Sequence, residues 1–251
     1  MYRRGVGWIV SRQHTWAAAG LAVVIALGAV GCSSGDGKKS SGDGKTSPSV
    51  SASGGATGAG GAPGGVKALP GLPTVSTART DLAGLKVAPV GSMTGYSRDK
   101  FQHWIGQGGK CDTRETVLNR DGTGVKQDSE CKAVSGKWFS RYDHLSFDSA
   151  SKMDIDHTVP LANAWRSGAS SWTSEQRKAF ANDLTHPQLV AVSAASNRAK
   201  GDQSPDQWAP PAKDYWCAYG ESWTAVKATY KLTVTQAEKA KLTEMLNMCA
   251  A

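Results

Sequence analysis

Two short apolar segments, each with polar residues at its end, constrain the fold of this chain most strongly. In the first, residues 153–161, an acidic residue precedes a histidine, and a proline closes the apolar run. In the second, residues 187–202, an apolar run leads into Ser-Asn-Arg-Ala-Lys-Gly-Asp. Such runs suit short buried strands, and a proline cannot continue a strand ladder. We expect a strand, a return strand and a helix that bring polar residues of both segments to one site.

Three side chains in these segments suit the hydrolysis of a phosphodiester. The carboxylate of Asp156 and the amide oxygen of Asn197 are hard ligands that match Mg²⁺ or Mn²⁺. A neutral imidazole at His157 can take a proton from an attacking water near neutral pH. One divalent ion, Mg²⁺ or alternatively Mn²⁺, would neutralise charge on the phosphoryl and leaving oxygens. The set favours a metal-dependent phosphodiesterase.

The same residues carry a family resemblance. The run Asp-Ile-Asp-His-Thr-Val-Pro-Leu, then Pro-Gln-Leu-Val-Ala-Val-Ser and Ser-Asn-Arg-Ala-Lys-Gly-Asp, resembles the HNH endonucleases of the ββα-metal (His-Me finger) superfamily. More narrowly, residues 96–249 are similar to secreted actinobacterial HNH family proteins of a lipoprotein type. The resemblance implies an α+β fold that contains a ββα-metal core with flanking helices. Local turn signals add a preceding β-hairpin, and composition adds a disordered N-terminal tether.

The resemblance also implies roles for individual residues. His157 would be the general base, Asp156 the first metal ligand and Asn197 the second. The middle motif position, often an asparagine, falls at or near His186, so this chain departs from the family pattern there. That residue usually steadies the loop and does not touch the ion, so the departure affects the loop more than the chemistry.

Each of the other polar residues near the motif could have a role at the site or be an ordinary surface or ion-paired side chain. By resemblance, Arg114 and Arg120 are candidate phosphate contacts, although an arginine is more often solvated or ion-paired. Lys200 could contact a phosphate or be a surface charge. Asp154 shares the strand face of Asp156, so it could support the metal ligands or be a solvated carboxylate.

The formal net charge of +8 and a sequence pI near 9.3 favour a polyanionic partner. Nucleic acid and anionic lipid headgroups both meet that description. We expect nucleic acid, DNA more than RNA, and a monomeric protein. The sequence contains no zinc finger, helix-turn-helix or repeat that would supply sequence selectivity, so we expect low sequence specificity.

The N-terminal third has the composition of an export signal followed by a linker. Residues 1–31 have a basic start and an apolar run that is short for a membrane span. Cys32, preceded by small residues, resembles the lipobox of a bacterial lipoprotein; a plainly cleaved signal is the alternative. Residues 32–75 are mostly Gly, Ser and Ala, typical of a flexible tether. We expect a nuclease domain at 76–251, exported and either lipid-anchored on the outer face of the cytoplasmic membrane or secreted.

Four further cysteines lie after the linker, and in an exported chain an even number implies disulfides. Three pairings are possible. We favour Cys111–Cys131 and Cys217–Cys249, because each closes a local loop around one structural unit. Zinc binding by these cysteines is a less favoured alternative, since no two of them are close in sequence.

Periodicity and capping signals predict most of the remaining elements. The expected helices are 96–105, 162–168, 173–182 with a capping box at Thr173, 212–230, and a last helix that begins with a capping box at Thr235. The residues on either side of Ser135-Gly136 predict a hairpin. Residues 66–90 are expected to be an extended lead-in.

The sequence is also compatible with two other functional classes. One is a non-catalytic module that binds nucleic acid or an anionic polymer. The other is a hydrolase of cell-wall polymers, and the only support for it is the expected location of the protein outside the cell. A binder needs none of the three residues Asp156, His157 and Asn197, so their joint presence favours the enzyme.

Overall fold

The structure is a computed structural model that describes residues 67–250. The predicted signal peptide, Cys32 and most of the predicted linker lie outside the described residues. The described chain is mixed α and β. Its elements are α1 (Val75–Gly84), α2 (Thr113–Asp121), β1 (Thr123–Gln127), β2 (Ala133–Phe139), β3 (Ser146–Phe147), β4 (Met153–His157), α3 (Leu161–Arg166), α4 (Ser174–Ala181), β5 (Leu189–Ser193), α5 (Ala194–Lys200), α6 (Trp216–Thr229) and α7 (Gln236–Asn247).

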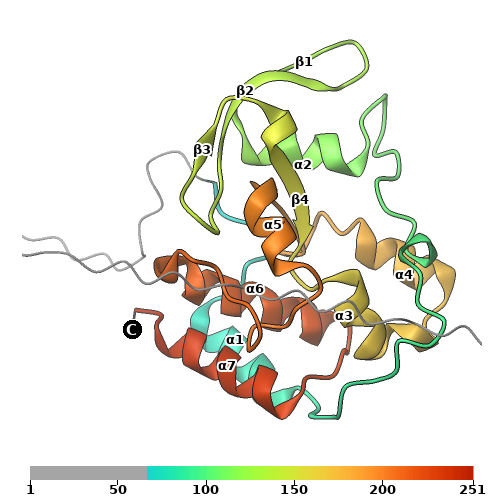
Figure 1. Cartoon of the computed structure of the whole chain (residues 1–251), viewed down its shortest axis with the longest axis vertical. Coiled ribbons are helices and arrows are strands. Elements are labelled where there is room, and N and C mark those ends of the chain that lie inside the picture. The colour runs from blue at the N-terminus through green and yellow to red at the C-terminus, as the bar shows by residue number, and fades with distance from the viewer. Residues whose placement is uncertain (1–66, 251) are drawn as a thin grey trace, which may run out of the picture. The chain divides into compact units, whose positions relative to one another are not determined.

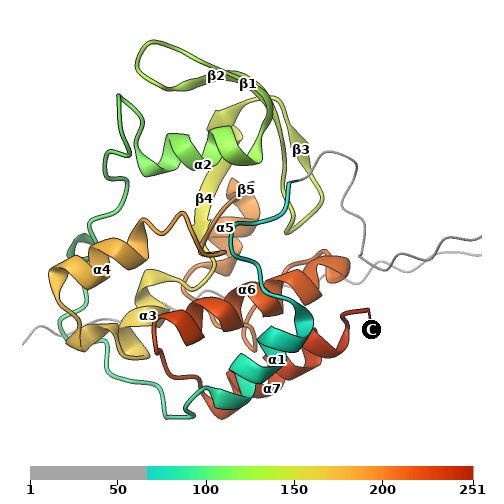
Figure 2. The same cartoon turned by 180° about the vertical axis from the view of Figure 1, so that it is seen from behind.

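These elements form two small antiparallel sheets and a group of packed helices. One sheet has the order β1-β2-β3 and the other pairs β4 with β5. Helices α1, α6 and α7 lie together at one end of the domain, the three-stranded sheet lies at the other, and β4, β5 and α5 lie between them (Figures 1 and 2). No helix within residues 67–250 is both long enough and apolar enough to span a membrane.

Strands β4 and β5 and helix α5 follow one another in the arrangement that the two apolar segments predict. Asp156 pairs with Val190 and His157 with Leu189 in the antiparallel ladder. All five residues of β5 are buried, which explains its unbroken apolar run. Helix α5 follows β5 directly, with the hydroxyl of Ser193 as its N-cap, and it ends at Gly201, whose φ of 54° is left-handed. Glycine accepts that conformation without a steric penalty.

The helices around this unit confirm several sequence predictions. Thr173 and Thr235 each close a capping box, at the starts of α4 and α7. Both predicted disulfides are present: Cys111 is joined to Cys131, and Cys217 to Cys249. The second disulfide connects the start of α6 to the chain just after α7, so it closes the two helices against each other.

Three local predictions are wrong. Only a short 3₁₀ turn, Arg98–Lys100, forms within the predicted helix 96–105, and Trp104 has a left-handed backbone with φ of 60°. Residues 66–90 contain α1, whose N-cap is the hydroxyl of Thr74. Strand β2 runs straight through Ser135-Gly136, and the hairpin turn lies earlier, where the carboxylate of Asp128 accepts hydrogen bonds from the amides of Glu130 and Lys132.

Candidate active site

The end of β4, the start of α3 and one side of α5 enclose a cavity of about 280 Å³. Asp156, His157 and Asn197 all line it, together with Tyr96 and Arg98 from the segment before α2. His157 is the last residue of β4, so the strand ends where two adjacent side chains can serve one site. The three residues predicted to carry the chemistry therefore border one space.

His157 is buried and held in one orientation. Its Nε2 lies 2.9 Å from the carbonyl oxygen of Ala181, at the end of α4. A carbonyl can only accept, so Nε2 carries the proton and Nδ1 keeps its lone pair. The indole of Trp104 stacks on the imidazole, with 5.6 Å between the ring centroids and 28° between the planes. Burial lowers the pKa of His157 to about 3, against the opposing effect of the Ala181 carbonyl, so the ring is neutral at neutral pH.

Asp156 lies behind His157 in a buried polar network. Its Oδ2 accepts a hydrogen bond of 2.6 Å from the hydroxyl of Tyr142. The ammonium of Lys200 lies 2.9 Å from both carboxylate oxygens and also donates to the carbonyl of His157. Burial raises the pKa of Asp156, while the charge of Lys200 and the Tyr142 hydrogen bond lower it. Because Oδ1 has Lys200 as its only partner among the described residues, it keeps an acceptor position for a further contact.

Asn197 reaches Asp154, the neighbour of Asp156 on the same strand face. Its Nδ2 donates a hydrogen bond of 3.0 Å to Oδ2 of Asp154. A carboxylate cannot donate unless it is protonated, so this contact fixes the amide with its nitrogen toward Asp154 and leaves its oxygen for another partner. The side chain of Asp154 is 32% exposed, and Arg198 lies 4.0 Å from it.

The remaining residues singled out from the sequence have contacts within the protein. Lys200 is fully buried, so the prediction that it contacts a phosphate is corrected: its ammonium neutralises Asp156 instead. Arg114 pairs with Glu115 and reaches the carbonyls of Ala150 and Met153, and its role toward substrate stays a prediction.

His186 lies in the loop between α4 and β5, where its Nδ1 contacts Asp183 at 2.7 Å. A second residue, Gln188, also holds this loop. Gln188 is fully buried and forms two hydrogen bonds with the backbone of Val159, through its Oε1 and its Nε2. This ties the segment after β4 to the residue just before β5.

Sequence reasoning missed six contributors to the site: Tyr96 and Arg98 at the cavity, and Tyr142, Trp104, Gln188 and the carbonyl of Ala181 around it. The carbonyl has no sequence signal at all, because every residue has one. Tyr142 and Trp104 are aromatic residues that composition assigns to the core. Gln188 is part of the motif segment 187–193, and a glutamine at the start of a buried strand is the one signal that could have identified it.

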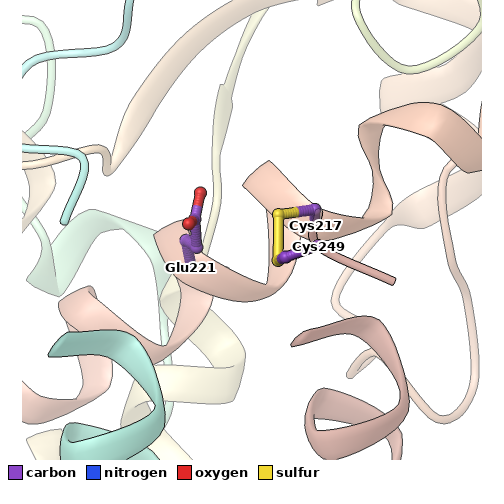
Figure 3. Close-up of side chains that lie close together, drawn as sticks. All are labelled: Cys217, Glu221 and Cys249. Carbon is purple, nitrogen blue, oxygen red and sulfur yellow. A yellow bond between two sulfur atoms is a disulfide. The ribbon is translucent and has the colours of Figure 1, made fainter. Parts of the chain in front are cut away.

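Among the His, Cys, Asp and Glu side chains of residues 67–250, one group of three could hold a metal ion, and none of its members lines this cavity. Cys217 and Glu221 are one turn apart on α6, next to Cys249 (Figure 3). The two sulfur atoms are joined in a disulfide, so no thiolate is available to a metal ion.

The chain belongs to a family of nuclease domains. Residues 113–245 match the family described as GmrSD restriction endonucleases, C-terminal domain. The match includes β4, β5 and α5, with every residue of the Asp156 network. It begins after the segment that carries Tyr96, Arg98 and Trp104.

A protein of the fungus Arthroderma benhamiae is a further relative. It is described as an uncharacterized secreted protein, and it is 58% identical over 180 residues, which cover 72% of this chain and 88% of that protein. No solved structure matches the chain. The narrower resemblance to actinobacterial lipoproteins stays a prediction.

Proposed function

We propose that this protein is an HNH endonuclease that hydrolyses phosphodiester bonds of nucleic acid outside the cell, with β4, β5 and α5 as its ββα-metal core. The observation that carries the proposal is the orientation of His157. Its Nε2 is fixed by a backbone carbonyl, so the lone pair of Nδ1 is left for an attacking water in a cavity that Asp156 and Asn197 also line. Membership of an endonuclease-domain family supports the same reading.

The donor set fits one hard divalent cation, Mg²⁺ or Mn²⁺. Oδ1 of Asp156 and the amide oxygen of Asn197 would hold it, and each is oriented by a neighbouring side chain, as is usual for metal ligands. When bound, such an ion neutralises charge that develops on the phosphate oxygens. The charge of Lys200 favours the ionised form of Asp156, against the effect of burial. The hydrogen bond to Asp154 holds the amide of Asn197 with its oxygen free for the ion.

The chain's own residues would act on the water and on the substrate. Nδ1 of His157 takes a proton from the water as it attacks phosphorus, and the bond to the leaving oxygen breaks on the opposite side. The imidazole is then charged, and the nearby phosphate offsets this charge. Trp104 shields one face of the ring from water, and the carbonyl of Ala181 stabilises the protonated ring.

A plasmid-nicking assay with Mg²⁺, Mn²⁺ or excess chelator tests the proposal. The parent protein is expected to nick supercoiled DNA only with a divalent ion. His157→Ala should lower the rate by about 10²–10⁴-fold, the usual contribution of a general base. His144→Ala is the matched control, because His144 is a half-exposed histidine paired with Asp214. Full activity in chelator, or equal rates for the two variants, would contradict the proposal.

Export is part of the proposal. The relative from Arthroderma benhamiae is described as secreted, and the two disulfides suit an oxidising compartment. Attachment through a lipid on Cys32 and a preference for DNA over RNA are proposed on the sequence alone. Mass spectrometry of the membrane fraction tests the lipid, and parallel assays on DNA and RNA test the preference.

A further inference from the structure

The segment from Gly95 to Ile105 lies before the matched family domain and forms one wall of the candidate active site. Tyr96 and Arg98 line the cavity that His157 and Asn197 border. Trp104, at the other end of the segment, stacks on His157. The domain that matches the family therefore does not enclose this site by itself.

The segment is held firmly between its two ends. Phe101 is fully buried against Trp165 and Phe180. The carbonyl of Lys100 accepts a hydrogen bond from the guanidinium of Arg177. The ammonium of Lys100 lies 5.1 Å from the ring centroid of Trp165. Such anchoring fixes the position of the residues between Tyr96 and Phe101 relative to the cavity.

Asn182 anchors the far end of the segment. Its Oδ1 accepts a hydrogen bond from the amide of Ile105, and its Nδ2 donates to the carbonyl of Gln102. Asn182 directly follows Ala181, whose carbonyl holds His157. The end of α4 thus positions both the imidazole and the backbone on either side of Trp104.

Arg98 is the cation that this segment presents at the cavity. It is exposed, and its guanidinium forms no ion pair or side-chain hydrogen bond with any residue of the described part of the chain. It is near enough to His157 for its charge to act on the ring. Arg198, from α5, also lines the cavity, with a side chain that is 78% exposed. An unpaired guanidinium next to a phosphodiesterase site suits a phosphate, which it can bind with two parallel hydrogen bonds.

We propose that residues 95–105 are a substrate-binding arm and that Arg98 contacts a backbone phosphate next to the scissile one. The inference rests on the proposed function, because it takes the cavity to be the place where a nucleic acid strand binds. It adds a contact from outside the matched domain. Arg114, Arg120 and Lys200, the phosphate candidates of the sequence, all have partners inside the protein.

Binding can be measured without cleavage in full-length His157→Ala protein with chelator, using a short labelled DNA duplex over a range of salt concentrations. Adding Arg98→Ala should weaken binding on the order of tenfold, the contribution of one charge-assisted hydrogen-bond pair. It should also reduce the slope of log K against log salt by about 0.9, the value for one lost phosphate contact. Arg98→Lys should restore most of the slope.

Arg79→Ala is the control, because it removes the same charge from an exposed arginine on α1 that does not line the cavity; the guanidinium of Arg79 donates to the carbonyl of Leu246. It should leave the slope unchanged. An Arg98→Ala slope equal to that of the Arg79→Ala variant would overturn the inference.

Cleavage kinetics separate this failure from a failure of the proposed function. In the otherwise unchanged protein, Arg98→Ala should raise KM for DNA and leave kcat within a factor of about two, since a contact shared by ground and transition state changes binding alone. If the parent protein binds DNA but never cuts it, the proposed nuclease function is wrong and the proposed substrate-binding role of residues 95–105 is unaffected. A parent that cuts DNA with a KM unaffected by Arg98→Ala would contradict the arm alone.

Discussion

His157 holds its only proton on Nε2, and its environment penalises a second one. Burial puts its folded-state pKa at about 3, whereas an exposed histidine in the unfolded chain titrates near 6.5. At neutral pH the ring is therefore unprotonated, the state in which a general base can accept a proton from water. The same pKa difference also has a consequence for stability.

The sign of this effect follows from proton binding. Below pH 6.5 the unfolded chain takes up a proton at His157 and the folded chain does not until about pH 3, so stability falls as the pH falls through this range. Between about pH 8 and pH 5 the loss is about 2 kcal/mol for one buried group. Urea unfolding of the parent and of His157→Gln, both in chelator, should show this difference. Parallel pH curves for the two proteins would show that His157 does not titrate as described.

Lys200 and Asp156 form a buried ion pair, and removing one partner leaves the other charge without compensation. Lys200→Met should lower the free energy of unfolding by about 3–5 kcal/mol. Lys110→Met is the control, because Lys110 and Glu130 form a pair in which both side chains are more than half exposed, and it should cost about 1 kcal/mol or less. Denaturant unfolding measures both.

A second substitution tests the cause of that loss. Changing Asp156 to Asn in the Lys200→Met protein removes the unpaired carboxylate, so part of the lost stability should return. A Lys200→Met protein as stable as the Lys110→Met protein would show that the buried pair contributes little.

At the scale of elements, α4 supports the site through its last turn. Asn182 forms four side-chain hydrogen bonds, with Ile105, Thr113, Gln102 and Lys178. Asn182→Ala should cost about 2–3 kcal/mol, because buried donors and acceptors lose their partners. It should also speed hydrogen exchange at the amides of residues 101–107. Gln176→Ala, in the capping box at the other end of α4, should cost about 1 kcal/mol and leave that exchange unchanged.

Local signals predicted the elements in which pattern and packing agree. The apolar runs predicted β4 and β5, and the two capping boxes predicted the starts of α4 and α7. The convergence of Asp156, His157 and Asn197 followed from the same runs. For each of these elements, the residues that predict it lie within a few positions of one another in the sequence.

The failures are places where tertiary contacts override the local signal. Ser135-Gly136 resembles a turn, but both residues lie within β2, which pairs with β1. The glycine leaves room for a neighbouring side chain, because a Cβ there would be 2.8 Å from the indole of Trp138. The apolar residues of 96–105 predict a helix, yet Trp104 adopts a left-handed backbone to stack on His157. Neither contact is visible from neighbouring residues.

At the scale of the whole molecule, residues 67–112 are part of the domain although they precede the family match. Leu69, Ala78, Leu82 and Leu85 are buried in the same core as Trp223 and Leu242. A protein that begins at residue 67 should therefore keep the melting temperature and nicking rate of the full chain. One that begins at residue 86 loses all four of these residues and should be destabilised on the order of 5 kcal/mol. Calorimetry of both truncations checks this, and equal melting temperatures would contradict it.

The contact between His157 and Ala181 has a practical implication for mutagenesis. The acceptor is a peptide oxygen, so every residue type at position 181 supplies the same oxygen, and a survey of side-chain substitutions would pass over the group that fixes the tautomer of the base. Replacing the Ala181–Asn182 peptide bond with an ester, which makes that oxygen a poorer acceptor, would weaken this contact and leave the Ala181 side chain intact.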